Sequence, residues 1–213
     1  MKLRGLYAIT PEALGTDAGT DALIAAVRAA LDGGAAVLQY RNKQADAATR
    51  REQAGALLAL ARKRGVPLIV NDDVDLAESI DADGVHVGKR DAEVAAARRR
   101  LPGKLLGVSC YASLLRARDA VAAGADYVAF GSVYPSPTKP GAVRAPLNLF
   151  HEARGLEVPL VAIGGITIGN APELVRAGAD CIAVISDLFG APDVRKRAAE
   201  FARMFASAPA FSP

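Results

Sequence analysis

Short apolar runs alternate with alanine-rich segments of helical spacing along almost the whole chain, and this alternation most restricts the fold. The apolar runs are Leu3–Ile9, Ala36–Tyr40, Pro67–Val70, Gly84–Val87, Leu105–Val108, Tyr127–Phe130, Leu160–Ile163 and Cys181–Ile185. Continuous apolar runs of this length are typical of strands that are covered on both faces. The helical segments are Asp21–Asp32, Ala47–Arg64, Val74–Ser79, Asp91–Arg100, Ser113–Ala122, Leu147–Arg154, Ala171–Arg176 and Val194–Phe205. The pattern predicts eight strands and eight helices in strict alternation, an α/β protein with a parallel sheet.

The junctions from helix to strand repeat one another. They read Gly33-Gly34-Ala35-Ala36-Val37, Asp81-Ala82-Asp83-Gly84-Val85, Ala123-Gly124-Ala125-Asp126-Tyr127 and Ala177-Gly178-Ala179-Asp180-Cys181. A glycine at such a junction ends a helix in the left-handed conformation. Near-copies of one turn indicate one repeated strand–helix unit.

Eight such units in 213 residues fit a single (β/α)8 TIM barrel at the small end of its size range. The alternative is a doubly wound open sheet, but no Gly-x-Gly-x-x-Gly turn follows the first strand. We therefore predict one barrel domain over residues 1–206. Residues 207–213 are small with recurring prolines and are expected to form a flexible tail.

Charge and cysteine content argue against several classes of protein. The net charge is only +3, and no basic stripe interleaves with aromatic residues, so no nucleic-acid partner is expected. The run Arg98-Arg99-Arg100 ends a predicted helix, where cations complement the helix dipole. Cys110 and Cys181 are too few for a zinc site or a disulfide framework and indicate reduced thiols. No apolar run is long enough for a signal peptide or a membrane span, so the expected location is the cytoplasm, and a homo-oligomer is left open.

Polar or glycine-rich residues follow seven of the eight predicted strands. Because the C-terminal ends of barrel strands share one rim, these residues are expected to form the active site. They include Gln39-Tyr40-Arg41-Asn42-Lys43, Asn71-Asp72-Asp73, Gly88-Lys89-Arg90-Asp91, Ser109-Cys110, Ser136-Pro137-Thr138-Lys139, Gly164-Gly165 and Ile185-Ser186.

A phosphate site is predicted after the last two strands. Gly164-Gly165 opens a loop that leads to Asn170, a plausible helix N-cap, and to Pro172 in the first helical turn. Backbone N–H groups in such a turn can bind phosphate, and Ser186 adds a hydroxyl. Three cations on the same rim, Arg41, Lys43 and Lys139, would suit a diphosphate.

The acidic residues of the rim leave two interpretations open. Asp72 and Asp91 follow neighbouring strands, and two carboxylates suit Mg²⁺, which keeps waters and takes phosphate oxygens. An ordinary N-cap explains Asp91 equally well, and a turn explains Asp72. His86 lies inside a strand run and is interpreted as a hydrogen-bonded core histidine. With His151 on an outer helix, neither a zinc cluster nor a Ser-His-Asp triad is indicated.

Taken together and in order, the strand ends resemble those of the thiamine-phosphate synthase family. The segments that carry the resemblance are Gln39–Lys43, Val70–Asp73, Gly84–Gly88, Gly107–Ser109, Ala125–Val128, Pro135–Pro140 and Ile163–Ile166. The resemblance implies an Mg²⁺-dependent transferase that joins hydroxymethylpyrimidine diphosphate to hydroxyethylthiazole phosphate and releases diphosphate. It also implies that the diphosphate leaves first, and that the thiazole nitrogen attacks the resulting pyrimidine methylene cation.

Residue roles follow from the same resemblance. Those implied for the pyrimidine diphosphate are Gln39, Arg41, Lys43, Asn71, Ser109 and Lys139, with Tyr40 and Asn42 in the same segment. Asp72 and Asp91 would bind Mg²⁺. The thiazole phosphate would contact Ser136, Pro137, Thr138, Gly165, Ile185 and Ser186. Arg41, Lys43, Ser109 and Lys139 are the catalytic candidates, and whether Ser109 orients the pyrimidine or donates to the leaving diphosphate stays open.

Two positions depart from the family pattern. Lys89-Arg90 precede Asp91 where the family has glutamine and an acidic pair, which bears on Mg²⁺ affinity, and Ser136 replaces a frequent threonine. The alternative functions are the related thiazole tautomerase and a non-catalytic protein that binds thiamine phosphates. The segment 132–144 is long enough to close over substrates.

Overall fold

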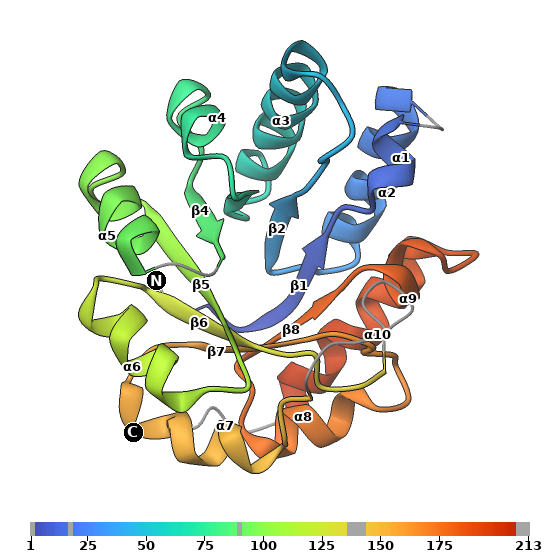
Figure 1. Ribbon diagram of the computed structural model, residues 1–213. Coiled ribbons are helices and arrows are strands. Elements are labelled where there is room, and N and C mark those ends of the chain that lie inside the picture. Colours follow the sequence, from blue (N-terminus) through green and yellow to red (C-terminus); the bar gives the residue numbers. More distant parts are fainter. Residues whose placement is uncertain (1–2, 17–18, 89–90, 136–143, 208–213) are drawn as a thin grey trace.

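Parallel strands close into a barrel that is surrounded by helices (Figure 1). The computed structural model describes residues 3–16, 19–88, 91–135 and 144–207. In these ranges the strands are β1 (Gly5–Ile9), β2 (Val37–Tyr40), β3 (Leu68–Asn71), β4 (Gly84–Val87), β5 (Leu105–Tyr111), β6 (Tyr127–Phe130), β7 (Leu160–Ile163) and β8 (Cys181–Val184). Each strand pairs with the next, and β8 pairs with β1. The (β/α)8 prediction is confirmed, and the open-sheet alternative is wrong.

The helices alternate with the strands along the chain. They are α1 (Glu12–Thr16), α2 (Gly19–Asp32), α3 (Ala47–Arg62), α4 (Val74–Ser79), α5 (Asp91–Arg100), α6 (Leu114–Ala122), α7 (Asn148–Glu152) with the 3₁₀ turn η1 (Ala153–Leu156), α8 (Ala171–Ala177), α9 (Ser186–Phe189) and α10 (Val194–Ser207). The short helices α1 and α9 were not predicted, because four or five residues are too few to show a helical period. The predicted tail overlaps α10 at Ser207, and the rest of it lies outside the described residues.

Side chains of alternate strand residues fill the inside of the barrel. The inner apolar cluster contains Leu3, Tyr7, Ile9, Val37, Ile69, Tyr127, Ala129, Val161, Cys181 and Ala183. A larger cluster lies between the strands and the helices. The period of two that places Val37 and Ile69 inside also points Gln39 and Asn71 inward, at the C-terminal ends of the same strands. The lower barrel is therefore an apolar plug beneath a polar mouth.

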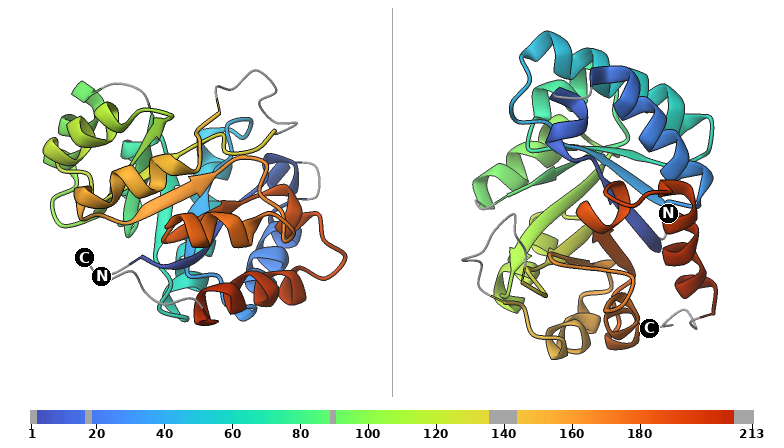
Figure 2. Two further views of the ribbon diagram at one scale, coloured as in Figure 1. Left: turned by 90° about the horizontal axis from the view of Figure 1, so that it is seen from below. Right: turned by 90° about the vertical axis from the view of Figure 1, so that its right-hand side faces the viewer.

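Helix α2, near the start of the chain, packs beside α10, near its end, and so closes the ring of helices (Figure 2). The C-terminal end of α2 packs against α10 so closely that a Cβ at Gly33 would lie 2.4 Å from the Arg195 carbonyl oxygen. Arg4 donates to the Phe205 carbonyl oxygen at 2.8 Å and lies over the Phe205 ring. These contacts fix the start of β1 against the last helix.

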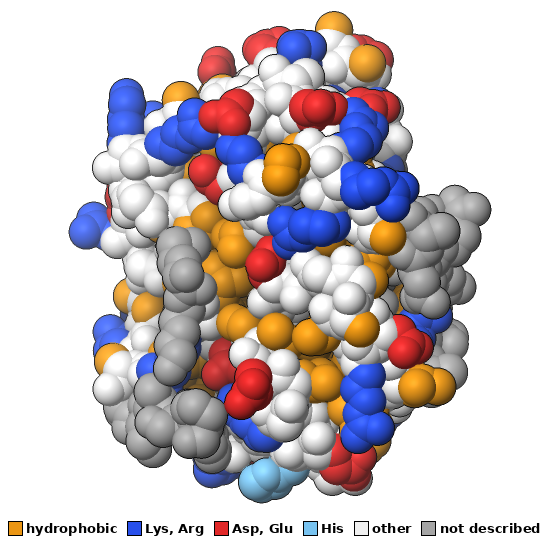
Figure 3. Space-filling model, turned by 90° about the vertical axis from the view of Figure 1, so that its left-hand side faces the viewer, with side chains coloured by type: hydrophobic (Ala, Val, Ile, Leu, Met, Phe, Trp, Pro, Cys, Tyr) orange, Lys and Arg blue, Asp and Glu red, His pale blue; other side chains and the backbone are white. Residues whose placement is uncertain are grey.

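Charged side chains of both signs surround a hollow of hydrophobic side chains on the face in Figure 3. In the upper part of that face, arginine and lysine side chains lie interspersed with aspartate and glutamate. No helix among the described residues is long and apolar enough to cross a membrane.

Arg98 ties three segments together at the N-terminal end of the barrel. Its guanidinium donates to the carbonyl oxygens of Gly124, Leu101 and Lys104 and pairs with Asp126. The sequence analysis gave Arg98 only the role of complementing the helix dipole, and the structure adds these hydrogen bonds and the ion pair with Asp126.

Replacing Arg98 with alanine is expected to lower the free energy of unfolding by ~2 kcal/mol, because several carbonyl groups lose their donor. Turnover should stay unchanged, since Arg98 lies at the end of the barrel opposite the mouth. Urea unfolding and a turnover assay measure the two effects. Arg99→Ala, an exposed neighbour in the same helix, is the control and should change neither.

Candidate active site

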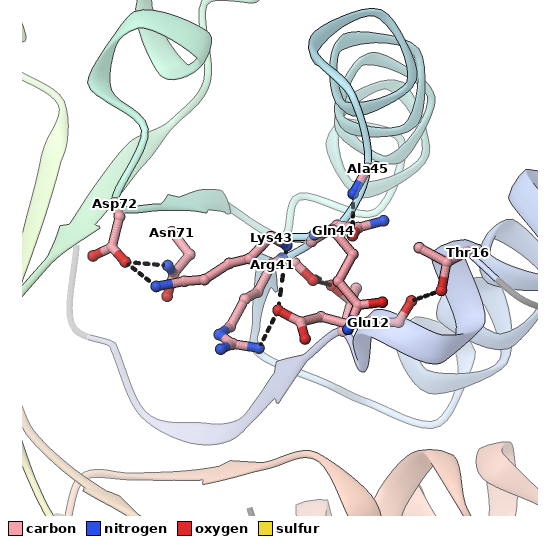
Figure 4. Close-up of polar contacts among 10 residues, drawn as sticks. Glu12, Thr16, Arg41, Lys43, Gln44, Ala45, Asn71 and Asp72 are labelled. Atoms are coloured by element: carbon pink, nitrogen blue, oxygen red, sulfur yellow. Dashed lines mark hydrogen bonds and ion pairs between the residues drawn. The ribbon is translucent and has the colours of Figure 1, made fainter.

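The C-terminal ends of β2 and β3 bring cations and a carboxylate into contact (Figure 4). Lys43 Nζ donates to Asp72 Oδ2 at 2.8 Å, and Asn71 Nδ2 donates to the same oxygen at 2.8 Å. Asp72 has a left-handed backbone with φ of 60°, and its N–H donates to the His86 carbonyl oxygen at 2.8 Å. Strained backbone at a polar rim is typical of functional sites. The structure therefore joins three of the predicted site residues.

Arg41 is held by a residue that the sequence analysis did not identify. Its Nη1 donates to Glu12 Oε1 at 2.9 Å, and the same oxygen accepts from the Lys43 backbone N–H at 3.2 Å. The backbone N–H of Arg41 donates to Thr10 Oγ1 at 2.9 Å. The segment after β2 is thus fastened to the segment after β1, which presets the Arg41 side chain beside the mouth.

Tyr40 and Asn42 face away from the mouth. The Tyr40 hydroxyl donates to Gln53 Oε1 of α3 at 2.8 Å, and Asn42 Nδ2 donates to that oxygen at 3.2 Å. Gln53 in turn donates to the Gly15 carbonyl oxygen at 2.7 Å. The prediction that these two side chains contact substrate is therefore corrected, because alternation points Tyr40 outward and both bind α3.

A buried chain of hydrogen bonds crosses the barrel beneath the mouth. Gln39 Nε2 donates to the Tyr7 hydroxyl at 2.8 Å, and the Tyr7 and Tyr127 hydroxyls are 2.8 Å apart. The Tyr127 hydroxyl lies 3.1 Å from His86 Nδ1, and His86 Nε2 lies 2.9 Å from Ser109 Oγ. Two predicted substrate-binding residues, Gln39 and Ser109, are thus the ends of one chain.

Burial sets the protonation of this chain. It lowers the pKa of His86 to about 4, although the charge of Asp72 acts in the opposite direction. It raises the pKa of the Tyr7 and Tyr127 hydroxyls above their ordinary range. Near neutral pH His86 is therefore uncharged and both tyrosines keep their protons. The expectation of a hydrogen-bonded core histidine is confirmed.

The glycine pair after β7 forms a tight turn against the segment that follows β6. Gly164 and Gly165 both have positive φ, and a Cβ at Gly165 would lie 2.3 Å from the Pro135 carbonyl oxygen. Asn170 occupies the N-cap position of α8, as predicted, but its side chain makes no capping hydrogen bond to the helix. Its Nδ2 donates to the Gly165 carbonyl oxygen and its Oδ1 accepts from the Thr167 N–H, so this side chain stabilises the turn.

The end of β8 lies beside this turn. Ile185 precedes α9, and Ser186 is the exposed first residue of that helix. Asp187 accepts from the Ile168 N–H at 3.1 Å and pairs with Arg197 at 2.6 Å. Asp187 therefore fixes the loop that follows Gly164-Gly165 to the start of α9, the helix that Ser186 begins.

Several predicted site residues lie outside the part of the chain that the structure describes. These are Ser136, Pro137, Thr138 and Lys139, with most of the expected closing segment 132–144. Asp91 is the first residue of α5, and its side chain also lies outside the described part.

The described residues supply one carboxylate that suits Mg²⁺. Among them there is no group of three or more histidine, cysteine, aspartate or glutamate residues that could hold a metal ion. Asp72 is half-exposed, and its Oδ1 lies toward Gly88, at the end of β4 that leads to Asp91. A single oxygen ligand at an open rim fits Mg²⁺, which keeps waters and takes substrate phosphate oxygens.

The sequence analysis missed Tyr7, Tyr127 and Glu12. Tyr7 and Tyr127 occupy inward positions of predicted strands, and a buried tyrosine needs a partner for its hydroxyl. Alternation along the strands could have found them. Glu12 belongs to the unpredicted helix α1, so no signal in the sequence pointed to it.

Comparison with known proteins agrees with this geometry. A family model described as thiamine monophosphate synthase matches residues 6–188. The chain is 55% identical over 206 residues to the thiamine-phosphate synthase of Aromatoleum aromaticum, covering 96% of this chain and 97% of the relative. It is 56% identical over 207 residues to that of Thiobacillus denitrificans, covering 96% of each.

A solved structure gives the same result for the fold. Thiamine phosphate pyrophosphorylase from Pyrococcus furiosus is 36% identical and superposes with a TM-score of 0.85. The alignment covers 97% of this chain and 98% of that one.

Proposed function

The chain belongs to the thiamine monophosphate synthase family, and we propose that its barrel mouth couples a hydroxymethylpyrimidine diphosphate to a hydroxyethylthiazole phosphate. The activity is that of a thiamine-phosphate synthase, a transferase. A C–N bond forms between the pyrimidine methylene carbon and the thiazole nitrogen, and the C–O bond to the diphosphate breaks. The products are thiamine phosphate and free diphosphate.

The cluster after β2 and β3 supports binding of the diphosphate. Arg41 and Lys43 are positioned in advance by Glu12 and Asp72, and both offer N–H donors to an anion. Developing charge on a leaving diphosphate is stabilised by donors that are already in place. The Lys43–Asp72 contact is the observation that carries the proposal, because it joins a phosphate-binding cation to a candidate metal ligand.

Mg²⁺ would be held by Asp72 together with Asp91. When bound, it supplies neutralisation of the leaving diphosphate. The protein residues do the remaining work: Arg41, Lys43 and Lys139 bind the diphosphate, and Gln39, Asn71 and Ser109 orient the pyrimidine. Water must also be kept from the pyrimidine methylene cation, which the apolar plug beneath Gln39 favours.

The thiazole phosphate is assigned to the other side of the mouth. Gly165, Ile185 and Ser186 lie on the two loops that Asp187 joins, and Ser136 to Thr138 would complete the site. Loops after the last two strands are the frequent phosphate site of such barrels. Binding the two substrates on opposite sides places their rings face to face, which lowers the entropic cost of reaction.

A turnover assay with both substrates, in Mg²⁺ and then in EDTA, tests this function. Thiamine phosphate and diphosphate should appear together and only with metal. Binding of thiazole phosphate without product would instead support a tautomerase or a non-catalytic binding protein, neither of which the similar proteins favour.

Replacing Lys139 with alanine is expected to lower kcat/KM for the pyrimidine diphosphate about tenfold, by loss of one charged hydrogen bond. Calorimetry should show that affinity for the thiazole phosphate changes less. The exposed Lys63 of the α3 end, replaced by alanine, serves as the control. An equal loss for both substrates would show that Lys139 acts only through the loop.

A further inference from the structure

The hydrogen-bonded chain that has Gln39 and Ser109 at its ends contains three further residues, Tyr7, Tyr127 and His86, which lie beneath the mouth. Tyr7 and Tyr127 are fully buried, and His86 is 8% exposed. The chain runs without a gap through strands β2, β1, β6, β4 and β5. A continuous polar chain inside an apolar plug requires every member to be satisfied.

Counting hydrogens gives the chain a direction. An amide nitrogen only donates, so the Tyr7 oxygen accepts from Gln39 Nε2 and the single Tyr7 hydrogen goes to the Tyr127 oxygen. The Tyr127 hydrogen then goes to His86 Nδ1. A neutral imidazole has one donor and one acceptor, so His86 carries its proton on Nε2 and donates to Ser109 Oγ.

We propose that Tyr7, Tyr127 and His86 are positioning residues whose hydrogen-bond chain holds the His86 proton on Nε2 and thereby presents the Ser109 hydroxyl to the mouth as a hydrogen-bond donor. The hydrogen of the Ser109 hydroxyl has no acceptor among the residues of this hydrogen-bonded chain, and it is left for the substrate. At the other end, Gln39 uses Nε2 inside the barrel, which leaves its Oε1 to accept.

A glycine in β5 makes room for this hydrogen-bonded chain inside the barrel. Gly107 pairs in register with Tyr127, and a Cβ at Gly107 would lie 2.0 Å from the Tyr127 ring. No other residue type would leave room for the phenol at this level of the plug. The Tyr127 ring also packs edge-on to Tyr7, with centroids 6.0 Å apart, and lies 5.6 Å from the His86 ring.

The direction of the chain matters for the choice of substrate. It offers an acceptor at Gln39 and a donor at Ser109, which matches a ligand with an amino group on one side and a ring nitrogen or diphosphate oxygen on the other. An oxo-pyrimidine would place an acceptor opposite the Gln39 oxygen and bind less well. This use of the chain rests on the proposed function, whereas its direction does not.

Nitrogen-15 NMR of the histidine rings in the free, full-length protein tests the direction without any substrate. The protein has two histidines, and the spectrum of His151→Gln shows which signals belong to His86. His86 should show a protonated Nε2 and an unprotonated Nδ1 near neutral pH. A protonated Nδ1 would mean that Ser109 donates to His86, and the proposal would be wrong.

Tyr127→Phe cuts the chain and should move the two His86 ring shifts toward each other. It should also lower kcat/KM for the pyrimidine diphosphate about tenfold, with KM for the thiazole phosphate unchanged. Tyr7→Phe leaves the Tyr127 hydroxyl in place with His86 Nδ1 as its acceptor, so this variant should keep the His86 shifts. The wild-type measurement still tests the direction if Tyr127→Phe does not fold. Tyr40→Phe removes a buried hydroxyl outside the chain and should leave the His86 shifts in place.

Two outcomes separate this proposal from the proposed function. If Tyr127→Phe leaves the His86 shifts and kcat/KM unchanged, the hydrogen-bonded chain does not position Ser109, whatever the reaction. If the shifts respond as expected but no thiamine phosphate forms in the wild type, the chain is real and the assigned reaction is at fault.

Discussion

Replacing Asp72 with asparagine is expected to lower kcat/KM for the pyrimidine diphosphate by ~10²–10³-fold, the loss typical of one preorganised electrostatic group. The substitution keeps the shape of the side chain but removes its charge. It thereby removes the only described carboxylate ligand of the candidate metal site and the partner of Lys43. Raising the Mg²⁺ concentration should recover part of the activity, because the remaining ligands still bind the ion weakly.

The adjacent residue supplies a matched control for this variant. Asp73 caps α4 by accepting from the Leu76 N–H, and it pairs with Arg50. Asparagine also caps helices well, so Asp73→Asn should keep the fold and leave turnover within about twofold. Activity at the wild-type level in Asp72→Asn, or an equal loss in both variants, would remove Asp72 from the metal site.

The fold could be predicted because each strand is buried on both faces and therefore is a short apolar run, and because the longer helices carry apolar residues at helical spacing. Even the junction glycines indicated the repeat, and Gly178 does end α8 in the left-handed conformation. The short helices α1 and α9 could not be predicted, because they depend on contacts with distant segments. Glu12 in α1, for example, binds Arg41, which is far along the chain.

The site was predicted in part, because strand ends meet at one rim in any such barrel. That rule brought Lys43, Asn71 and Asp72 together, as the structure confirms. It does not say which way a side chain points, so Tyr40 and Asn42 were assigned to the mouth although they bind α3. The direction in which a side chain points depends on the alternation of inward and outward residues along its strand, and on where that alternation ends.

Lowering the pH from 7 to 5 is expected to cost ~2 kcal/mol of stability through His86 alone. Burial lowers the pKa of His86 to about 4 in the folded protein, against an ordinary value of 6.5. Below pH 6.5 the unfolded chain therefore binds a proton that the folded chain does not, so stability falls as the pH falls. The loss grows until the pH passes the folded pKa, with a limit of ~3 kcal/mol for a shift of this size.

Urea unfolding at pH 5, 6 and 7 measures this loss as the difference between the wild type and His86→Gln, since other groups titrate equally in both. The exposed His151 is the control, and His151→Gln should keep the wild-type dependence of stability on pH.

Parallel plots of stability against pH for wild type and His86→Gln would mean that His86 accepts a proton inside the barrel. A charged imidazole there would donate from both nitrogens, so it would reverse the bond from Tyr127 while Ser109 remained an acceptor of the Nε2 hydrogen. Acid would then change the chain at Tyr127 before it unfolds the barrel, whereas the burial of His86 predicts that the chain and the fold are lost together.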